Sequence, residues 1–557
     1  MRWWSRGGRH DPEIAPDEIF LDATNTPSFD QARFEGRLER PLGRSTFAIL
    51  GGVLGVVFLI LLGQLWNLQI YQGAAYAAES THNSLSSHVL FADRGIITDR
   101  SGVALVTNEE GLEGHTIRRY LTPGFGSVLG YVSYPKKDTD GNYYETNMKG
   151  LAGLEAHFNE SLGGVNGTVL VEQDAVGKVR SQGVITPPVP GQSLTLSLDV
   201  RAQKAFYDAI RGLADSVPFM GGAGVLMDVR TGAVHALVSY PEYDPNVLSS
   251  GGPREVIAGY NASARKPYLD RAVAGLYAPG SIVKPLEAAG ALTDGIITPN
   301  VTVNSTGSIA VPNPYDPEHP TIFKDWKALG IVDMREAIAW SSDIYFYMVG
   351  GGYGGQRGLG IDRLAYWYRA FGLESPTGIE LPNESSGFVP TPAWKEKTYN
   401  EIWRIGDTYH TAIGQYAMQV TPVGVARAVA AIANGGTLVK PTLVNDAVVQ
   451  GEPIAVDQAA LRVVREGMRQ AVTEGTSAGL ASLESVVHIA GKTGTAQTGV
   501  RNEFYNSWAI GFFPYENPKY AYVVVMEKGP AGNSTGGVYV INQFLTKLYE
   551  VAPDYFE

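Results

Sequence analysis

The stretch Pro279-Gly-Ser-Ile-Val-Lys-Pro-Leu-Glu-Ala-Ala289 decides how this chain is interpreted. Ser281 and Lys284 are three residues apart, so a helix that begins here places both side chains on one face within contact distance. Pro285 falls close to the first turn, where a missing N–H costs least, and the residues after it are strong helix formers. The stretch therefore predicts a helix that carries a hydroxyl nucleophile beside an amine that can accept its proton.

The same Ser-x-x-Lys spacing occurs twice more, and neither copy suits a helix. Ser133–Lys136 encloses a proline, and Ser263–Lys266 runs directly into one. Other nucleophiles find little support in the sequence, because it has no cysteine and its nine histidines lie outside any triad pattern. Ser281 is therefore the predicted nucleophile, with Lys284 as its base.

Two further motifs follow in a fixed order along the chain. Ser341-Ser342-Asp343 lies at the predicted end of one helix and before an aromatic run. Lys492-Thr493-Gly494-Thr495 comes after the apolar run Val486–Ile489, in which a strand is predicted over Val487–Ile489. We expect the Lys-Thr-Gly on an edge strand, where it supplies a positive charge, a hydroxyl and a glycine that allows close backbone approach.

In this order, the three motifs resemble those of penicillin-binding proteins and serine β-lactamases. Residues that resemble the pedestal domain of class B penicillin-binding proteins are Arg94–Gly102, Gly153-Leu-Glu155, Gly167 with Asp174 and Gly177, Leu196–Asp199 with Gln203, and Asp244-Pro-Asn246. Residues that resemble the elongation-type member are Trp326-Lys327, Ser341–Tyr347, Asp407-Thr408, Gly414-Gln415 and Thr421-Pro422. The resemblance covers nearly everything from about residue 60 onward.

The resemblance implies a peptidoglycan D,D-transpeptidase that needs no cofactor and is acylated by β-lactams. Its donor is a stem peptide ending in D-alanyl-D-alanine, on lipid-linked or nascent glycan. Ser281 attacks the penultimate carbonyl, Lys284 takes the proton, and Ser341 relays a proton toward the leaving D-alanine. An amine of a neighbouring stem then resolves the acyl-enzyme and gives a 4,3 cross-link. By the same resemblance, Lys492, Thr493, Gly494 and Thr495 bind the substrate, and the backbone N–H groups of Ser281 and Thr495 form the oxyanion hole.

Asp343 stands where most of the superfamily has asparagine. A carboxylate close to Lys284 favours its ammonium form, which opposes a role as base. The resemblance marks aspartate here as a property of the elongation type. We expect the positive charge of Lys492 to offset Asp343 and to favour the free amine of Lys284.

An uncharged stretch, Phe47–Trp66, is long enough to cross a hydrocarbon core of roughly 30 Å as a helix. Arginines 33, 37, 40 and 44 precede it, and no Lys or Arg follows until Arg94. The positive-inside rule then predicts a single-pass protein of the inner (cytoplasmic) membrane, with a cytoplasmic N-terminus and an extracytoplasmic catalytic domain. The apolar run is too long for a typical signal peptide, so an uncleaved anchor is favoured.

We therefore predict an α+β multidomain chain. Residues 1–44 form a largely disordered cytoplasmic tail, residues 45–66 the anchor helix, and residues 67–204 an elongated β-rich, non-catalytic pedestal of the dimerisation type. Residues 205–557 form the transpeptidase domain. Strand patterns lie at both ends of that segment around a helix-rich middle, which predicts one antiparallel sheet built from chain-distant pieces and flanked by helices.

The net charge of −12 argues against a nucleic-acid partner. Asp316, His319 and Asp325 suggest a metal site, but the surrounding prolines favour a polar loop. Glu380 loosely resembles the deacylating base of class A β-lactamases, although the anchor and pedestal are foreign to those enzymes.

A β-lactam receptor is disfavoured, because it would need more than the one predicted span. Two alternatives to elongation stay open. A septal (division) transpeptidase would more often carry asparagine at position 343. A non-catalytic scaffold would activate a partner glycosyltransferase, and a SEDS-type polymerase is the expected partner, bound through the pedestal and the Gly51-x-x-x-Gly55 face of the anchor.

Overall fold

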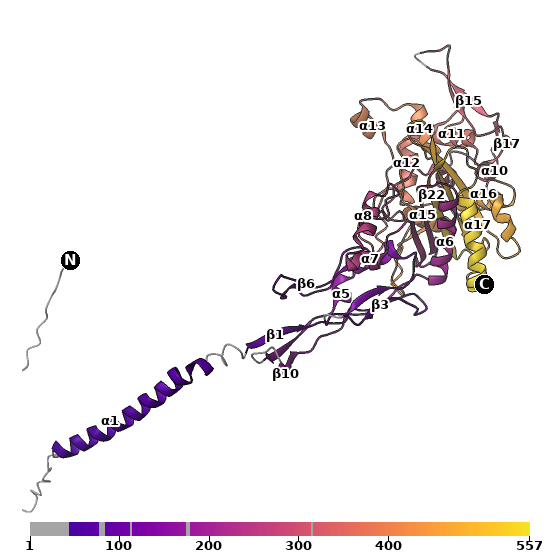
Figure 1. Ribbon diagram of the computed structural model, residues 1–557. Helices are drawn as coiled ribbons and strands as arrows, with labels where there is room; N and C mark the ends of the chain where they lie inside the picture. Colours follow the sequence, from indigo (N-terminus) through magenta and orange to yellow (C-terminus); the bar gives the residue numbers. More distant parts are fainter. Residues whose placement is uncertain (1–43, 77–83, 112–113, 174–178, 314–315) are drawn as a thin grey trace, which may run out of the picture. The chain divides into compact units, whose positions relative to one another are not determined.

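The computed structural model describes residues 44–76, 84–111, 114–173, 179–313 and 316–557 (Figure 1). The predicted cytoplasmic tail up to residue 43, and Asp174 and Gly177 of the predicted pedestal, lie outside these residues. Two compact units are present, and the first contains the helix α1 (Arg44–Trp66), which continues as the π-helix η3 (Asn67–Tyr71). Its segment Phe47–Tyr71 has a mean hydropathy of 2.4 and is long and apolar enough to cross a membrane, as the sequence predicts.

Short strands dominate the chain between α1 and residue 200. A three-stranded sheet has the order β1-β9-β10, and a four-stranded sheet has the order β11-β2-β3-β4. Ser133 and Lys136 fall in the short strands β5 and β6, which confirms that this Ser-x-x-Lys copy is not helical. The elements of this region are β1 (Ser84–Leu90), β2 (Ile97–Thr98), β3 (Ala104–Glu109), β4 (Ile117–Tyr120), α3 (Gly126–Leu129), β5 (Val132–Ser133), β6 (Lys136–Lys137), β7 (Tyr143–Glu145), β8 (Lys149–Gly150), α4 (Gly153–His157), α5 (Asn159–Gly163), β9 (Gly167–Gln173), β10 (Val179–Thr186) and β11 (Leu194–Thr195).

A buried cluster of opposite charges ties this region together. Glu155 accepts a hydrogen bond from Arg94 Nε at 2.6 Å and one from Arg118 Nε at 2.7 Å. All three side chains are at most 1% exposed. A carboxylate stripped of water is costly unless paired and hydrogen-bonded, and the two guanidinium groups meet that need. Arg94 and Glu155 of the pedestal motifs therefore have a structural role.

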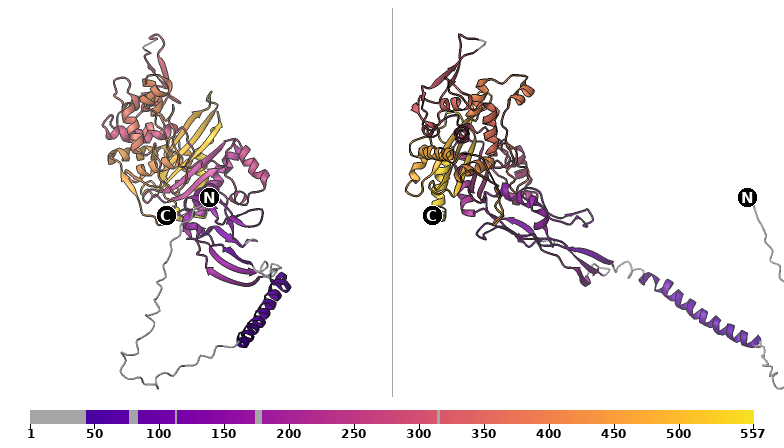
Figure 2. Two further views of the ribbon diagram at one scale, coloured as in Figure 1. Left: turned by 90° about the vertical axis from the view of Figure 1, so that its left-hand side faces the viewer. Right: turned by 180° about the vertical axis from the view of Figure 1, so that it is seen from behind.

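The largest sheet is antiparallel, with the order β13-β12-β22-β21-β20, and it joins segments from both ends of the predicted transpeptidase domain (Figure 2). Its strands are β12 (Gly221–Asp228), β13 (Val234–Tyr240), β20 (Ala490–Thr498), β21 (Phe504–Phe513) and β22 (Tyr520–Pro530). This confirms the sheet of chain-distant pieces. The strand predicted over Val487–Ile489 is wrong, because β20 begins at Ala490. Val487 and Ile489 are buried in a core cluster, and an apolar run signals burial rather than a strand partner.

Helices cover both faces of this sheet, as alternate side chains of β22 show. Val523 and Val525 belong to the core cluster that contains α15 (Pro422–Ala433), whereas Tyr522, Val524 and Met526 belong to the cluster of α6 (Val200–Ser216) and α17 (Gly537–Val551). Successive side chains of a strand point to opposite faces, so α15 lies on one face and the α6–α17 pair on the other. The predicted boundary between residues 204 and 205 falls inside α6, and its position stays a prediction.

The middle of the chain is rich in helices, as predicted, and it surrounds α9 (Lys284–Thr293), which is buried along eight of its ten residues. Ser263 ends α8, so the second rejected Ser-x-x-Lys copy is not helical either. The other elements from residue 245 on are α7 (Pro245–Ser250), α8 (Arg254–Ala262), η4 (Gly280–Val283), β14 (Val303–Ser305), β15 (Ser308–Val311), β16 (Thr321–Lys324), β17 (Gly330–Val332), α10 (Met334–Ala339), α11 (Asp343–Gly351), α12 (Gly360–Ala370), α13 (Pro392–Tyr399), α14 (Ile405–Ala412), β18 (Thr437–Val439), β19 (Gly451–Pro453), α16 (Gln458–Thr473), η5 (Ala478–Leu483) and η6 (Pro553–Tyr555).

Candidate active site

The predicted nucleophile lies one turn before the buried helix. Ser281 is half-buried in the 3₁₀ turn η4, and α9 then begins at Lys284 with a proline in its first turn. Gly280 has φ +59°, a left-handed conformation that a glycine adopts without strain. The chain therefore turns sharply before Ser281 and delivers its hydroxyl to the surface of a cleft, while the Lys284 side chain is fully buried.

The second motif is the junction of two helices. The Ser342 N–H donates to Ala337 O at 2.9 Å and the Ser341 N–H to Ile338 O at 3.3 Å, which is the Schellman pattern at the end of α10. Ser341 itself has φ +59°, at the position where glycine is usual, and this costs about 1–3 kcal/mol. Ser342 then caps α11 by accepting the Tyr345 N–H. The surrounding structure thus holds Ser341 in a conformation that serine does not favour.

The third motif lies on β20, an edge strand as expected. Thr493 and Thr495 are two residues apart, so they share one face, and both line the cleft. A Cβ atom at Gly494 would lie 2.8 Å from both Pro279 O and Ile282 Cγ2. Only glycine lets this strand run so close to η4, and this closeness brings the two threonines near Ser281.

Two lysine amines meet at Ser341. Lys284 Nζ donates to Ser341 O at 2.7 Å and to Asp343 Oδ1 at 2.6 Å, and it lies 3.3 Å from Ser341 Oγ. Lys492 Nζ lies 2.8 Å from Ser341 Oγ and donates to Thr493 O at 2.8 Å. The structure thus brings four of the five predicted catalytic side chains into one hydrogen-bonded cluster, with the Ser341 hydroxyl between the two amines, and the fifth, Ser281, lines the same cleft.

Burial and the neighbouring Lys284 lower the pKa of Lys492 well below its ordinary value, while Asp343 acts in the opposite direction. Asp343 forms its ion pair with Lys284, not with Lys492. The permanent positive charge expected at Lys492 is therefore disfavoured in the free site. Whether Lys492 offsets the effect of Asp343 on Lys284 stays a prediction.

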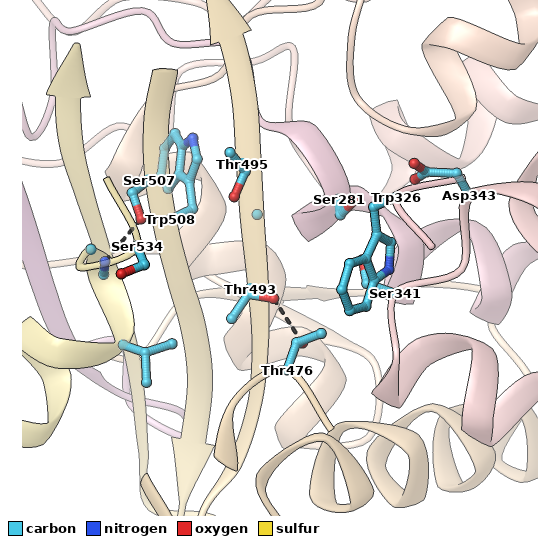
Figure 3. Close-up of a pocket in the computed structure, with 14 residues that line it drawn as sticks. Ser281, Trp326, Ser341, Asp343, Thr476, Thr493, Thr495, Ser507, Trp508 and Ser534 are labelled. Carbon is cyan, nitrogen blue, oxygen red and sulfur yellow. Dashed lines mark hydrogen bonds between the residues drawn. The ribbon is translucent and has the colours of Figure 1, made fainter. Parts of the chain in front are cut away.

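Figure 3 shows the cleft, whose volume is about 600 Å³. Ser281, Ser341, Asp343 and Trp326 line it from the helical side, and Thr493 and Thr495 from β20. Lining residues that the sequence does not single out are Thr476, Ser507, Trp508, Ser534, Gly536, Gly537 and Val538. Thr476 Oγ1 bonds Thr493 Oγ1 at 2.7 Å, and Trp508 Nε1 donates to Ala278 O at 3.0 Å. Ser507 and Trp508 reach the cleft through the pairing of β21 with β20, whereas Thr476 follows α16 and the other four lie before or at the start of α17, so contacts between distant segments bring them together.

Two sets of carboxylates considered from the sequence lie outside this lining. Glu380 accepts the Leu443 N–H at 2.8 Å, so it does not occupy the place of a deacylating base. His319 pairs with Asp316 at 3.0 Å, whereas Asp325 binds hydroxyl and backbone N–H groups. Over the described ranges, no group of three or more His, Cys, Asp or Glu side chains could hold a metal ion.

Comparisons with known proteins agree with this geometry. Residues 222–548 match the family described as the penicillin binding protein transpeptidase domain, and residues 111–196 match the penicillin-binding protein dimerisation domain. The peptidoglycan D,D-transpeptidase MrdA of Haemophilus influenzae is 32% identical over 464 residues, 76% of this chain and 68% of the relative.

Two solved structures are similar over most of the chain. PBP2 of Pseudomonas aeruginosa, in complex with WCK 5153, has a TM-score of 0.69 and 30% identity over 84% of this chain and 98% of the neighbour. PBP2 of Helicobacter pylori, in complex with MreC, has a TM-score of 0.70 and 27% identity over 84% of this chain and all of the neighbour. The elongation type is thus favoured over the septal, β-lactamase and scaffold alternatives, and the chain belongs to the class B penicillin-binding proteins of the elongation type.

Proposed function

We propose that this peptidoglycan D,D-transpeptidase forms its acyl-enzyme on Ser281 and cross-links stem peptides during cell elongation. The observation that carries the proposal is the convergence of three chain segments on one cleft, with Ser281, Ser341 and the β20 threonines on its wall and two lysine amines behind Ser341. Nucleophile, base, proton relay and anion-binding hydroxyls are then all within one site.

The donor peptide binds as an added strand along the open edge of β20, which supplies backbone hydrogen bonds. Its terminal carboxylate is held by Thr493 and Thr495, with Lys492 nearby. Ser281 Oγ attacks the penultimate carbonyl, and its proton passes to Lys284. The oxyanion is stabilised by the backbone N–H groups of Ser281 and Thr495.

Lys284 Nζ contacts Asp343 at 2.6 Å, and any lysine amine must be free of its extra proton before it can act as a base. The Ser341 hydroxyl contacts both amines, so it offers a path for that proton and, later, for protonation of the leaving D-alanine. The amine of a neighbouring stem then attacks the acyl-enzyme. β-Lactams acylate the same serine, since they present a strained amide at the position of the scissile bond.

The predicted topology places the N-terminus in the cytoplasm and the cleft outside the cytoplasmic membrane. A SEDS-type glycosyltransferase is the proposed partner, bound through α1 and the pedestal. Gly51 and Gly55 lie four residues apart on α1, and a Cβ atom at either would meet nothing within 4 Å, so a partner helix can approach there. The complex of the H. pylori relative with MreC, and a 27% identical neighbour from a "peptidoglycan synthase complex", support assembly with other proteins.

The decisive test is labelling of the full-length protein and Ser281→Ala with a fluorescent penicillin, followed by mass spectrometry of the acylated peptide. We expect the label on Ser281 and no label in the variant. Label on Ser133 or Ser263 would overturn the assignment. In cells, depletion of an elongation enzyme gives rounding, whereas depletion of a septal enzyme gives filaments.

The role of Asp343 is tested separately with Asp343→Asn. Loss of all acylation by labelled penicillin supports an essential carboxylate. Acylation at the wild-type rate contradicts it and assigns Asp343 to the subclass alone.

A further inference from the structure

A buried carboxylate, Asp325, collects five hydrogen bonds directly behind the second motif. It follows the last residue of β16 in the chain, and it is 9% exposed. Its Oδ2 atom accepts from Ser305 Oγ at 2.9 Å, Ser342 Oγ at 2.8 Å and the Ile344 N–H at 3.2 Å. Its Oδ1 atom accepts from the Asp343 N–H at 3.1 Å and the Trp326 N–H at 2.9 Å. In the described part of the chain, no other carboxylate accepts hydrogen bonds from the junction between α10 and α11 in this way.

The Asp325 carboxylate is held by hydrogen-bond donors at the N-terminus of a helix rather than by an ion pair with a cation. Two of its donors are the first N–H groups of α11, so the carboxylate sits at the positive end of that helix. The Ser342 hydroxyl accepts the Tyr345 N–H while donating to Asp325, which extends the same network by one residue. Hydrogen bonds to an ionised acceptor are about twice as strong as neutral ones, so the network resists distortion.

This network holds both catalytic groups of the second motif. Asp343 is bonded to Asp325 through its backbone and to Lys284 through its carboxylate at 2.6 Å. Ser341 precedes the bonded Ser342 and keeps its left-handed conformation only while the α10–α11 junction is held. Without Asp325, relaxation of this strained serine would move its hydroxyl away from the two amines.

The wall of the cleft depends on the same carboxylate. Trp326 follows Asp325, donates its N–H to it, and lines the cleft. The indole Nε1 of Trp326 donates to Trp340 O at 3.0 Å, at the end of α10. One carboxylate thus connects β14, the cleft wall and the N-terminus of α11.

We propose that Asp325 is a positioning residue of the transpeptidase site, which fixes Ser341 and Asp343 relative to Lys284 by anchoring the α10–α11 junction to β14. The assignment rests on the proposed function of that site. It implies that the rate of acylation depends on Asp325, although Asp325 does not line the cleft and touches no substrate. It also implies that the strand β14 supports catalysis through Ser305.

The test uses Asp325→Asn in the full-length protein in detergent. Asparagine keeps the shape but offers one acceptor oxygen, and in either orientation its amide nitrogen faces at least one backbone N–H, which cannot accept a hydrogen bond. Stopped-flow labelling with a fluorescent penicillin separates the non-covalent dissociation constant from the acylation rate constant. We expect the rate constant per folded molecule to fall at least tenfold and the dissociation constant to change less than threefold, because β20 is untouched.

Two controls separate positioning from general instability. Leu213→Ala in α6 removes a buried side chain from the other core cluster and should lower Tm while leaving the acylation rate constant within twofold. Ser305→Ala removes one of the five bonds and should slow acylation by about twofold to fivefold. An Asp325→Asn rate constant within twofold of wild type would overturn the proposal.

A readout without activity makes the test independent of the proposed function. Hydrogen exchange of residues 341–347 should accelerate at least tenfold in Asp325→Asn, whereas residues 490–496 of the β20 segment should keep their wild-type exchange. Unchanged exchange at 341–347 contradicts the proposal even if acylation falls. Failure of the wild type to react with penicillin would refute the proposed function, while the exchange result would still decide the role of Asp325.

Discussion

Replacement of Glu287 by leucine is expected to stabilise the protein, with an effect that grows as the pH rises. Glu287 lies on α9 one turn after Lys284 and is fully buried. Neither carboxyl oxygen has a hydrogen-bond partner among the residues described. A Cβ atom at Gly350 would lie 2.9 Å from Glu287 Oε1, so the carboxyl group packs against α11. Burial raises the pKa of Glu287 well above its ordinary value, and Lys284 opposes that rise.

The magnitude has two parts. A buried polar group without a partner costs about 1–3 kcal/mol, and leucine removes this cost at similar volume. The second part depends on pH, because the unfolded chain ionises near pH 4.3 while folded Glu287 stays protonated. The folded-state pKa is raised, so ionisation of Glu287 favours the unfolded chain. The free energy of unfolding is therefore highest below about pH 4.3, and it falls as the pH rises toward the folded-state pKa. The loss is about 1.4 kcal/mol per pH unit over that window.

The assay is thermal unfolding of the full-length wild type, Glu287→Leu and Glu287→Gln at pH 5 and pH 8. For a domain of this size the entropy of unfolding is about 0.7 kcal/mol/K, so 1–3 kcal/mol raises Tm by about 1–4 °C. The advantage of leucine over wild type should be larger at pH 8. Glutamine cannot ionise, so it should remove the pH dependence without the full gain. A lower Tm for Glu287→Leu at pH 8, or an advantage that does not grow with pH, would refute the reasoning.

Three further predictions concern other parts of the chain. Glu155→Gln leaves Arg94 and Arg118 buried without a countercharge, so it should lower the free energy of unfolding by about 3–5 kcal/mol. This loss should appear as faster proteolysis within the pedestal, and resistance equal to that of the wild type would contradict it. Burial raises the pKa of Glu242 to about 7, so the free energy of unfolding of the wild type should fall by up to about 3 kcal/mol between pH 4.5 and 7. In Glu242→Gln this free energy should depend less on pH, and equal slopes of free energy against pH in the two proteins would rule the idea out. Trp326 lines the cleft and is 54% exposed, so Trp326→Ala should weaken the non-covalent binding of fluorescent penicillin several-fold without changing the acylation rate constant. A slower acylation rate with unchanged affinity would assign Trp326 to the chemistry instead.

Local physical chemistry explains what the sequence determines by itself. The position of Pro285 in the first turn of a helix and the breakers in the two rival pairs are properties of neighbouring residues, and each leads to a correct prediction. The uncharged anchor segment and the edge position of the Lys-Thr-Gly strand follow in the same way. The spacing of Ser281 and Lys284 is equally local, and the pairing of nucleophile and base that it predicts stays a prediction. The order of the three motifs adds the resemblance to penicillin-binding proteins, and with it the eight predicted site residues.

Tertiary structure decides the rest, because the deciding interactions join residues that are far apart in the chain. The apolar run before β20 predicts burial but not whether a partner strand is present, and so the predicted strand over Val487–Ile489 is wrong. The five bonds of Asp325 come from β14, α11 and the residues flanking it, and no local pattern announces them. Burial, which no single segment determines, lowers the pKa of Lys492 and leaves Glu287 without a partner. The sequence indicates the candidate catalytic groups, whereas their orientation and surroundings depend on the fold that is built around them.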